Sequence, residues 1–254
     1  MDEAQDLHAA HRRLLRSLAP VNPNDLFIVG DTFQRIYDNR VSLGALGIDI
    51  RGRSRKLTLN YRTTRQILGT ALTVLGDDSY DDLDNGIETL HGYRSVLRGT
   101  RPVLRGFPTS GAELAALCEQ VQAWHGSGIP LDEIAVIART NPLVVKAAAA
   151  LSAAAIKATH LKSGQTPRTD AGVQAMTMHR AKGLEFRAVA IIGASAGQMP
   201  ADFAVTPDSA DHIEHQHGTQ RERSLLFVSA TRARDALAIT WTGQPSPFLA
   251  AQDH

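Results

Sequence analysis

The sequence predicts an α/β fold, a parallel sheet flanked by helices, and three observations support it. Short apolar runs rich in β-branched residues recur along the 254 residues, and helical patterns lie between them. These runs are continuously apolar, which is typical of strands buried on both faces of a parallel sheet. The composition, 43% hydrophobic and 21% charged, is that of a globular chain able to bury a core.

The predicted elements follow one another along the whole chain. Strands are expected at residues 26–29, 56–59, 102–104, 134–138, 173–177, 188–193 and 236–240. Helices are expected at residues 8–18, 64–75, 111–124, 142–155 and 220–232. Loops are expected in the polar or proline-containing stretches 76–86, 163–172 and 197–218.

Individual runs differ in how clearly they mark an element. The run at 26–29 stops at a Gly-Asp pair, which is a turn signal. The run at 188–193 is the strongest, and the run at 102–104 is weaker. The alanine-rich stretch at 147–156 is too short to cross a membrane and fits a helix of a soluble protein.

Charge and cysteine content exclude several classes of protein. The formal net charge is +1, so any nucleic-acid binding must come from a local surface. The single cysteine, Cys118, excludes a disulfide framework and suits a reducing cytoplasm. No run reaches the ~18 apolar residues of a membrane helix, and the acidic start does not resemble a signal peptide. We therefore expect a cytoplasmic location and no membrane partner.

Two groups of polar residues early in the chain carry candidate chemistry. Asp2 and Glu3 form an acidic pair, in which one carboxylate can hold Mg²⁺ and the other can orient a water molecule. Such a pair is also typical of a solvated terminus. Asp31 follows the first predicted strand, with Gln34 and Tyr37 nearby, and ligands bind at such strand ends. A simple Gly-Asp turn is the alternative interpretation.

Three later groups combine cations with hydroxyl, ring or carboxylate side chains. Tyr61 offers a flat face for a base and Arg62 a fork of donors for phosphate, although both also fit an ordinary strand end. Residues 177–186 place a hydroxyl, an imidazole, two cations and a carboxylate between two predicted strands. Residues 222–234 predict an amphipathic helix with Arg232 near its end, which also fits a solvated basic helix end.

The order of these groups is more specific than any one of them. The chain contains, in sequence, Asp-Glu-x-Gln, Gly-Asp-x-x-Gln-x-Ile-Tyr, Leu-x-x-Asn-Tyr-Arg, Thr-x-His-x-x-Lys-Gly-Leu-Glu-Phe and Leu-Leu-Phe-Val-x-x-Thr-Arg-Ala. This series resembles motifs two to six of the superfamily 1 DNA helicases of the UvrD/Rep/PcrA type. The resemblance spans the chain from Asp2 to the last predicted strand.

The resemblance implies a RecA-like, P-loop NTPase-type fold, in which two domains sandwich ATP and single-stranded DNA crosses their tops. Residues 1–54 would be a remnant of the first RecA-like domain. Residues 55–254 would be the second one, the UvrD-like helicase C-terminal domain.

The resemblance also implies roles in ATP hydrolysis. Asp2 would hold Mg²⁺ and Glu3 would activate the attacking water, while Gln34 would sense the γ-phosphate. Arg62 and Arg232 would reach the same phosphate from the second domain. An arginine in this position contributes on the order of 10³–10⁵ in rate in phosphoryl-transfer enzymes.

Two further sets of residues follow from the same resemblance. In the nucleotide-binding set, Tyr61 would stack on adenine and Glu185 would contact the ribose. The full set consists of Gln5, Tyr61, Gly183 and Glu185. The DNA-binding set would couple the nucleotide state to the bound strand, and consists of Tyr37, Arg40, Thr177 and His179.

The sequence departs from the family pattern in four places. No Gly-x-x-x-x-Gly-Lys-Ser/Thr loop occurs, and no lysine follows a glycine, so the usual cradle for the β- and γ-phosphates is missing. Only Met1 precedes the acidic pair, which predicts a mobile terminus and a strand at 26–29 with an exposed edge. The family's Tyr-x-Trp-Arg-Gly string is replaced after Tyr37, which leaves Arg40 as the expected contact. The large inserted helical domain of many relatives is expected to be absent or minimal.

We therefore expect the C-terminal portion of an ATP-dependent 3′–5′ DNA helicase, inactive alone, with ATP and Mg²⁺ as cofactors of the complete enzyme. Its expected partners are single-stranded and duplex DNA. The alternative is a non-catalytic module derived from a helicase, which binds either DNA or another protein, such as a separate ATP-binding RecA-like domain. A third interpretation is a metal site at His212, His215 and His217, although no cysteine lies nearby.

Overall fold

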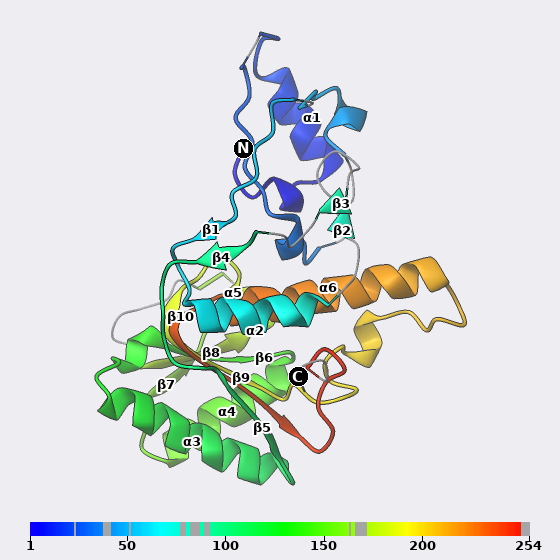
Figure 1. The fold of residues 1–254 in the computed structure, drawn as a ribbon. Coiled ribbons are helices and arrows are strands. Elements are labelled where there is room, and N and C mark those ends of the chain that lie inside the picture. Colours follow the sequence, from blue (N-terminus) through cyan, green and yellow to red (C-terminus); the bar gives the residue numbers. More distant parts are fainter. Residues whose placement is uncertain are drawn as a thin grey trace.

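The computed structural model describes residues 1–22, 24–37, 42–50, 52–76, 80–81, 87–88, 92–162, 164–165 and 172–249. A six-stranded parallel sheet forms its centre, with strand order β5-β10-β9-β6-β8-β7 (Figure 1). Its strands are β5 (Val103–Phe107), β6 (Ile134–Ala138), β7 (Ala158–His160), β8 (Val173–Thr177), β9 (Phe186–Ile192) and β10 (Ala233–Thr242).

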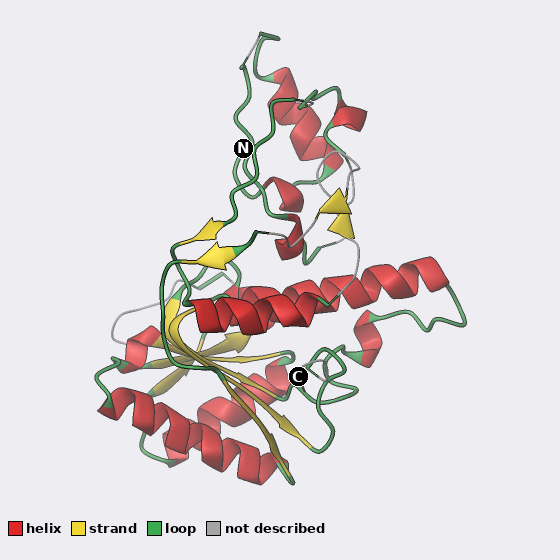
Figure 2. Ribbon diagram, viewed as in Figure 1, coloured by secondary structure: helices red, strands yellow, loops and turns green. Residues whose placement is uncertain are grey.

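Helices cover both faces of this sheet (Figure 2). The first face packs against α2 (Arg65–Leu75), α5 (Met178–Ala181) and α6 (His212–Ala230). The second face packs against α3 (Ser110–Gly126) and α4 (Asn141–Ala153). Strand side chains alternate between these cores: Val189 and Ile191 face the first, and Ala190 and Ile192 the second. The predicted fold class is confirmed. We call the sheet and these five helices the main body.

The N-terminal segment, residues 1–22, 24–37 and 42–50, stands away from the sheet beyond α2 and α6 (Figure 1). It contains α1 (Ala9–Ser17) and the short 3-10 helices η1 (Ala4–Asp6), η2 (Thr32–Gln34) and η3 (Gly44–Leu46). Phe33 of η2 is 1% exposed and its ring packs edge-on against Tyr80, Tyr93 and Phe227. This contact anchors the segment on the first core.

The remaining elements are short. Two pairs of two-residue strands lie outside the main sheet, namely β1 (Leu59–Asn60) with β4 (Arg94–Ser95) and β2 (Tyr80–Asp81) with β3 (Ile87–Glu88). Two further 3-10 helices are η4 (Leu131–Glu133) and η5 (Asp202–Ala204). No helix in the described ranges combines the length and apolar character that crossing a membrane requires.

The predicted strand at 26–29 is wrong. The segment is extended, but only isolated backbone hydrogen bonds hold it: Val29 N donates to Met1 O (2.8 Å) and Ala4 N donates to Val29 O (3.0 Å). Phe27 is 82% exposed. An apolar run becomes a strand only when a partner strand satisfies its backbone, and composition alone cannot supply that partner. The chain start is nevertheless tied down, since the Met1 ammonium donates to Phe27 O (2.6 Å).

The predicted boundary of the last helix is also wrong. Helix α6 begins at His212, inside the predicted loop 197–218, and ends at Ala230. Asp211 caps it by accepting a hydrogen bond from Glu214 N (3.0 Å). The first half of α6 is polar because it projects beyond the sheet, as exposed Ile213 indicates, so apolar periodicity could not reveal it.

Several short elements also differ from the sequence predictions. The run at 56–59 yields only β1, shifted to Leu59–Asn60. Strand β7 and the single-turn α5 were not predicted, because three or four residues give too little periodicity to detect. Much of the predicted loops 76–86 and 163–172 lies outside the described residues. A domain boundary at residue 54 stays a prediction.

Candidate functional site

Arg232 is the most buried cation of the predicted site. It lies in the turn between α6 and β10 and is 4% exposed. Its Nε donates to Val228 O (3.0 Å), one terminal nitrogen donates to Leu184 O (3.4 Å), and the other to Gln34 Oε1 (3.4 Å). Burial first, and then the charge of Arg62, lower its pKa to about 10. The guanidinium is therefore positioned by the main body and directed at the N-terminal segment.

Residues far apart in sequence converge on Arg232. Glu3, Asp31 and Glu185 all raise its pKa through their negative charge, while Arg62 lowers it. Arg62 Nε lies 3.1 Å from Glu185 Oε2, and both side chains are about half exposed. We call Glu3, Gln34, Arg62, Glu185 and Arg232 the arginine cluster.

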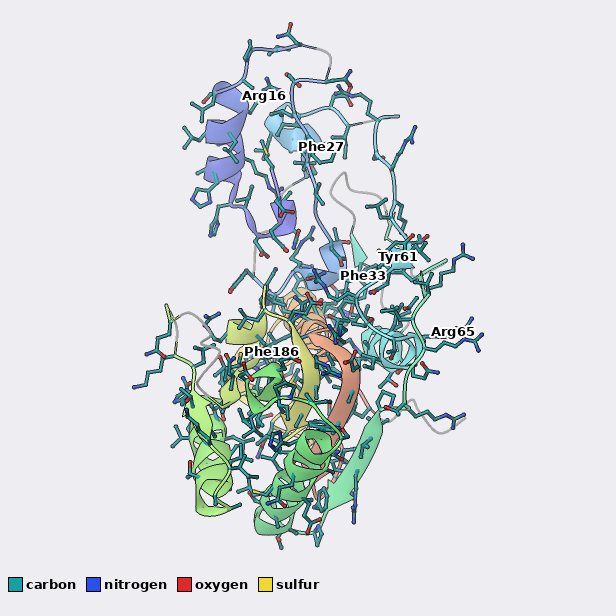
Figure 3. The ribbon with its side chains drawn as sticks, turned by 90° about the vertical axis from the view of Figure 1, so that its left-hand side faces the viewer. Arg16, Phe27, Phe33, Tyr61, Arg65 and Phe186 are labelled. Carbon is teal, nitrogen blue, oxygen red and sulfur yellow. The ribbon has the colours of Figure 1, made fainter. Side chains whose placement is uncertain are left out.

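The arginine cluster forms where the N-terminal segment meets the main body. Glu185 directly precedes β9 and Arg232 directly precedes β10, so the main-body side of the cluster lies at the amino ends of two central strands. Figure 3 labels Phe33 and Tyr61 at this junction, and Phe186, the first residue of β9, below it. The turn signals in the sequence did not indicate that the amino ends of β9 and β10 would lie against the N-terminal segment.

Lys182 connects the two parts of the molecule, although it was not among the predicted site residues. Its Nζ donates to Gln34 O (2.8 Å) and lies 2.5 Å from Asp6 Oδ2 and 3.8 Å from Glu3 Oε2. Burial raises the pKa of Asp6, and the ammonium of Lys182 opposes this shift. The lysine was present in the recognised motif, but its partners Gln34, Asp6 and Glu3 lie 148, 176 and 179 residues before it in sequence, which no local pattern reports.

The remaining predicted nucleotide-side residues lie in different surroundings. Asp2 is exposed, and its Oδ1 accepts from Glu3 N (2.9 Å). Gln5 is fully buried, where it donates to Glu3 Oε2 (2.5 Å) and accepts from Asp31 N (3.0 Å). Tyr61 is 70% exposed. Gly183 has a φ of +78° with open space where a Cβ would point, so its backbone conformation, not crowding, favours glycine.

Three of the four predicted DNA-binding residues lie near one another. Thr177 ends β8 and begins the turn that leads to His179 in α5. The rings of Tyr37 and His179 lie 6.2 Å apart, and Lys182 Nζ lies 5.9 Å from the Tyr37 ring. Burial, followed by the charge of Arg139, lowers the pKa of His179. Arg40 lies outside the described residues.

Sequence reasoning missed a buried ion pair beside this group. Arg139, which follows β6, donates from Nε to Glu222 Oε2 (2.9 Å) and from a terminal nitrogen to Oε1 (2.8 Å). Glu222 is 3% exposed and also accepts from Ala201 N (3.1 Å). The only available signal was an arginine directly after a strongly predicted strand, and this is too common to single out.

The interpretation of three histidines as a metal site is wrong. His212 contacts Asp208 Oδ1 (2.6 Å), His215 contacts Thr206 O (2.8 Å), and His217 lies 4.0 Å from Glu214. Along α6, His212 and His215 are three residues apart and share a helix face, but His217, five residues after His212, lies off that face. Over the described ranges of the chain, no three His, Cys, Asp or Glu side chains are grouped as metal ligands.

Known proteins resemble this chain in sequence and in fold. It is 28% identical over 263 residues to a Mycoplasma pneumoniae protein named "Probable DNA helicase", which covers 98% of this chain and 46% of that protein. It is 42% identical over 72 residues to "ATP-dependent DNA helicase PcrA" of Staphylococcus aureus, covering 28% of this chain and 9% of that one. The chain thus spans less than half the length of either relative.

A solved structure and a family model extend these similarities. The C-terminal domain of a possible DNA helicase from Lactobacillus plantarum WCFS1 superposes with a TM-score of 0.54 at 21% identity, over 77% of this chain and 95% of that one. This likeness supports the RecA-like fold. The family model of the UvrD-like helicase C-terminal domain matches residues 55–165 and 153–244, well over half of the sequence. The chain therefore belongs to the UvrD-like helicase C-terminal domain family.

Proposed function

We propose that this chain is the C-terminal part of an ATP-dependent DNA helicase and that Arg232 acts on the γ-phosphate of ATP held by a phosphate-loop domain. The single observation that carries this proposal is the convergence of four cluster residues on Arg232. A buried guanidinium aimed at the boundary with a second domain is the arrangement that stabilises transferring phosphate in two-domain NTPases. We expect the protein to act in the cytoplasm, which fits a chain with one cysteine.

The chemistry of the arginine cluster fits a polyphosphate. Arg62 and Arg232 are close enough for the first to lower the pKa of the second, so a multiply charged anion between them would relieve a repulsion already present. The exposed ring of Tyr61 can stack on adenine, and Glu185 can accept hydrogen bonds from ribose. Gln34 contacts Arg232 directly and would sense the γ-phosphate with it.

The acidic pair fits the proposed Mg²⁺ and water chemistry. Mg²⁺ in NTPases is usually held by one or two carboxylates together with substrate phosphates and water, and Asp2 offers one exposed carboxylate for this role. Glu3 lies beside Gln5 and Lys182 and can take a proton from a water molecule. We propose Gln5 and Gly183 as supports of the nucleotide site. Gln5 acts through Glu3 and Asp31.

ATP hydrolysis by this chain alone is not expected. The sequence holds no Gly-x-x-x-x-Gly-Lys-Ser/Thr loop, and this loop supplies the backbone N–H groups and the lysine that bind the β- and γ-phosphates. The arginine cluster would contribute only one side of the nucleotide site.

DNA binding is proposed at Tyr37, Thr177 and His179, with Arg40 as a further contact. The Tyr37 ring can stack on a base, and His179 lies beside it. Lys182 and Gln34 join this group to the arginine cluster, which gives a physical route from the nucleotide to the DNA strand. We propose that closure of the two domains around ATP shifts the hold on single-stranded DNA in the 3′ to 5′ direction and unwinds the duplex.

The test is ATP hydrolysis by the purified chain, measured with and without single-stranded DNA. The measurement is repeated after adding a RecA-like domain that carries the phosphate loop of a relative. We expect no turnover by the chain alone and DNA-stimulated turnover by the pair, lost when Glu3→Gln is introduced. Turnover by the unaided chain that Glu3→Gln abolishes, or a pair with no activity, would refute the proposal.

A second candidate is a non-catalytic module that pairs in trans with another ATP-binding domain. Exposed apolar side chains on and after α1 favour it: Leu14 is 58% exposed, Leu18 72% and Val21 88%. A RecA-like partner that covers them would also receive Arg232 at its nucleotide. Failure of such a domain to bind the chain, together with the absence of DNA binding at low salt, would exclude this candidate.

A further inference from the structure

An exposed aromatic ring lies in the connection between β9 and α6. Phe203, in η5 (Asp202–Ala204), is 76% exposed. Figure 1 shows this connection passing below α6, close to the C-terminal turn of the chain. Backbone hydrogen bonds confirm the closeness, since Ser246 N donates to Ala194 O (2.8 Å) and Ala196 N donates to Gln244 O (3.0 Å). The ring is thus presented from the carboxyl side of the sheet.

Arg139 packs against one face of this ring. The guanidinium carbon of Arg139 lies 5.0 Å from the centroid of the Phe203 ring, which is a cation–π contact. Glu222 holds that guanidinium through two of its nitrogens, and the side chains are only 10% and 4% exposed. Because Glu222 also accepts from Ala201 N, the same carboxylate fixes the backbone two residues before Phe203. The exposed ring therefore has a rigid base, unlike an ordinary loop side chain.

The ring lies next to the residues proposed to bind DNA. Ala138, the residue before Arg139, is paired with Thr177 in the register of β6 and β8. The charges of Arg139 and Glu222 both reach His179 and shift its pKa in opposite directions. Through its contact with Arg139, Phe203 therefore lies near Thr177 and His179 at the carboxyl ends of β6 and β8, which we call the DNA-binding edge.

We infer that Phe203, resting on Arg139, is a stacking platform for an unpaired base of single-stranded nucleic acid. A ring of which 76% is exposed can take a base on its uncovered surface, and a cation beneath a π-system adds to such stacking. The inference rests on the proposed function, because it extends the same DNA-binding edge. Every base has a π-face, so the platform would select single strands without selecting sequence.

The test is equilibrium binding of a fluorescent oligothymidylate to the full chain at low salt. Phe203→Ala removes the ring, Phe203→Leu keeps an apolar side chain without a π-face, and Phe203→Trp keeps an aromatic one. Phe27→Ala is the matched control, because Phe27 is also a highly exposed phenylalanine (82%) but lies on the N-terminal segment (Figure 3). Each protein is also measured against an oligonucleotide of equal length that lacks bases.

The expected pattern separates stacking from a structural effect. Phe203→Ala and Phe203→Leu should weaken oligothymidylate binding by about 5- to 150-fold, the range for one lost stacked base. Phe203→Trp and Phe27→Ala should bind as the unchanged protein does. All five proteins should bind the baseless strand equally.

Three outcomes would overturn the inference. Normal binding by Phe203→Ala would show that the ring takes no base, although the chain binds DNA as proposed. An equal loss on the baseless strand would show that the substitution disturbs the edge and removes no stacking contact. No binding of either strand by the unchanged protein would overturn the proposed DNA binding itself, and the platform with it.

Discussion

At the scale of single residues, burial disfavours the charged form of two groups, Arg232 and His179. Arg232, in the turn after α6, is 4% exposed, and His179, within α5, is partly buried and feels the charge of Arg139. In both cases burial is the largest cause of the lowered pKa, so each group is held with its charge disfavoured. A negatively charged ligand would favour the charged form in both places.

His179 predicts a dependence of stability on pH. Its pKa in the folded chain lies below the usual value of 6.5, so the unfolded chain takes up a proton first as the pH falls. The stability contribution is therefore complete above pH 6.5 and is lost as the pH falls towards the folded pKa. The unchanged protein should lose more free energy of unfolding than His179→Asn between about pH 7.5 and about pH 5.5. Urea titrations of both proteins check this, and equal losses would contradict the position of His179.

At the scale of elements, the long buried strands could be predicted from sequence. Strands β6 and β8 appear at the predicted residues, because short, largely apolar runs are normally buried as central strands of a parallel sheet. The first half of α6 could not be predicted, since it is polar and projects beyond the sheet, where no apolar periodicity is needed. The segment 26–29 has the composition of a strand but pairs with no strand in the described part of the chain.

Helix α6 offers a test at this scale. Asp211 is its capping residue, and Asp211→Ala should lower the free energy of unfolding by about 1 kcal/mol. Asp211→Asn is the matched control, because an asparagine oxygen can accept the same hydrogen bond from Glu214 N. Urea unfolding of the three proteins measures the effect. If alanine and asparagine cost the same, the side-chain cap does not stabilise α6.

At the scale of the whole molecule, the candidate site depends on contacts between the N-terminal segment and the main body. Sequence motifs identified Glu3, Gln34, Arg62, Glu185 and Arg232, and the structure brings all five together. Lys182, Glu222 and Phe203 were missed because their partners are set by the packing of distant elements. Order along the chain revealed the family, while the links between the two parts required the fold.

Phe33 predicts how firmly the N-terminal segment is held. Its buried ring contacts Tyr80, Tyr93 and Phe227, so Phe33→Ala should remove about 3–5 kcal/mol of packing. Limited proteolysis should then cut within residues 1–50 much faster than in the unchanged protein. Tryptophan fluorescence follows the main body separately, because Trp124 and Trp241 both lie there. Unchanged cleavage would mean that Phe33 does not anchor the segment.

The central claim is that Arg232 acts on ATP held by a phosphate-loop domain, and one rate comparison tests it most directly. DNA-stimulated ATP hydrolysis is measured for the pair of proteins with Arg232→Lys, and with Arg234→Lys as control, since Arg234 is an exposed arginine paired with Asp235. We predict a fall of about 10³-fold or more for Arg232→Lys and an unchanged rate for Arg234→Lys. An unchanged rate for Arg232→Lys would contradict the account.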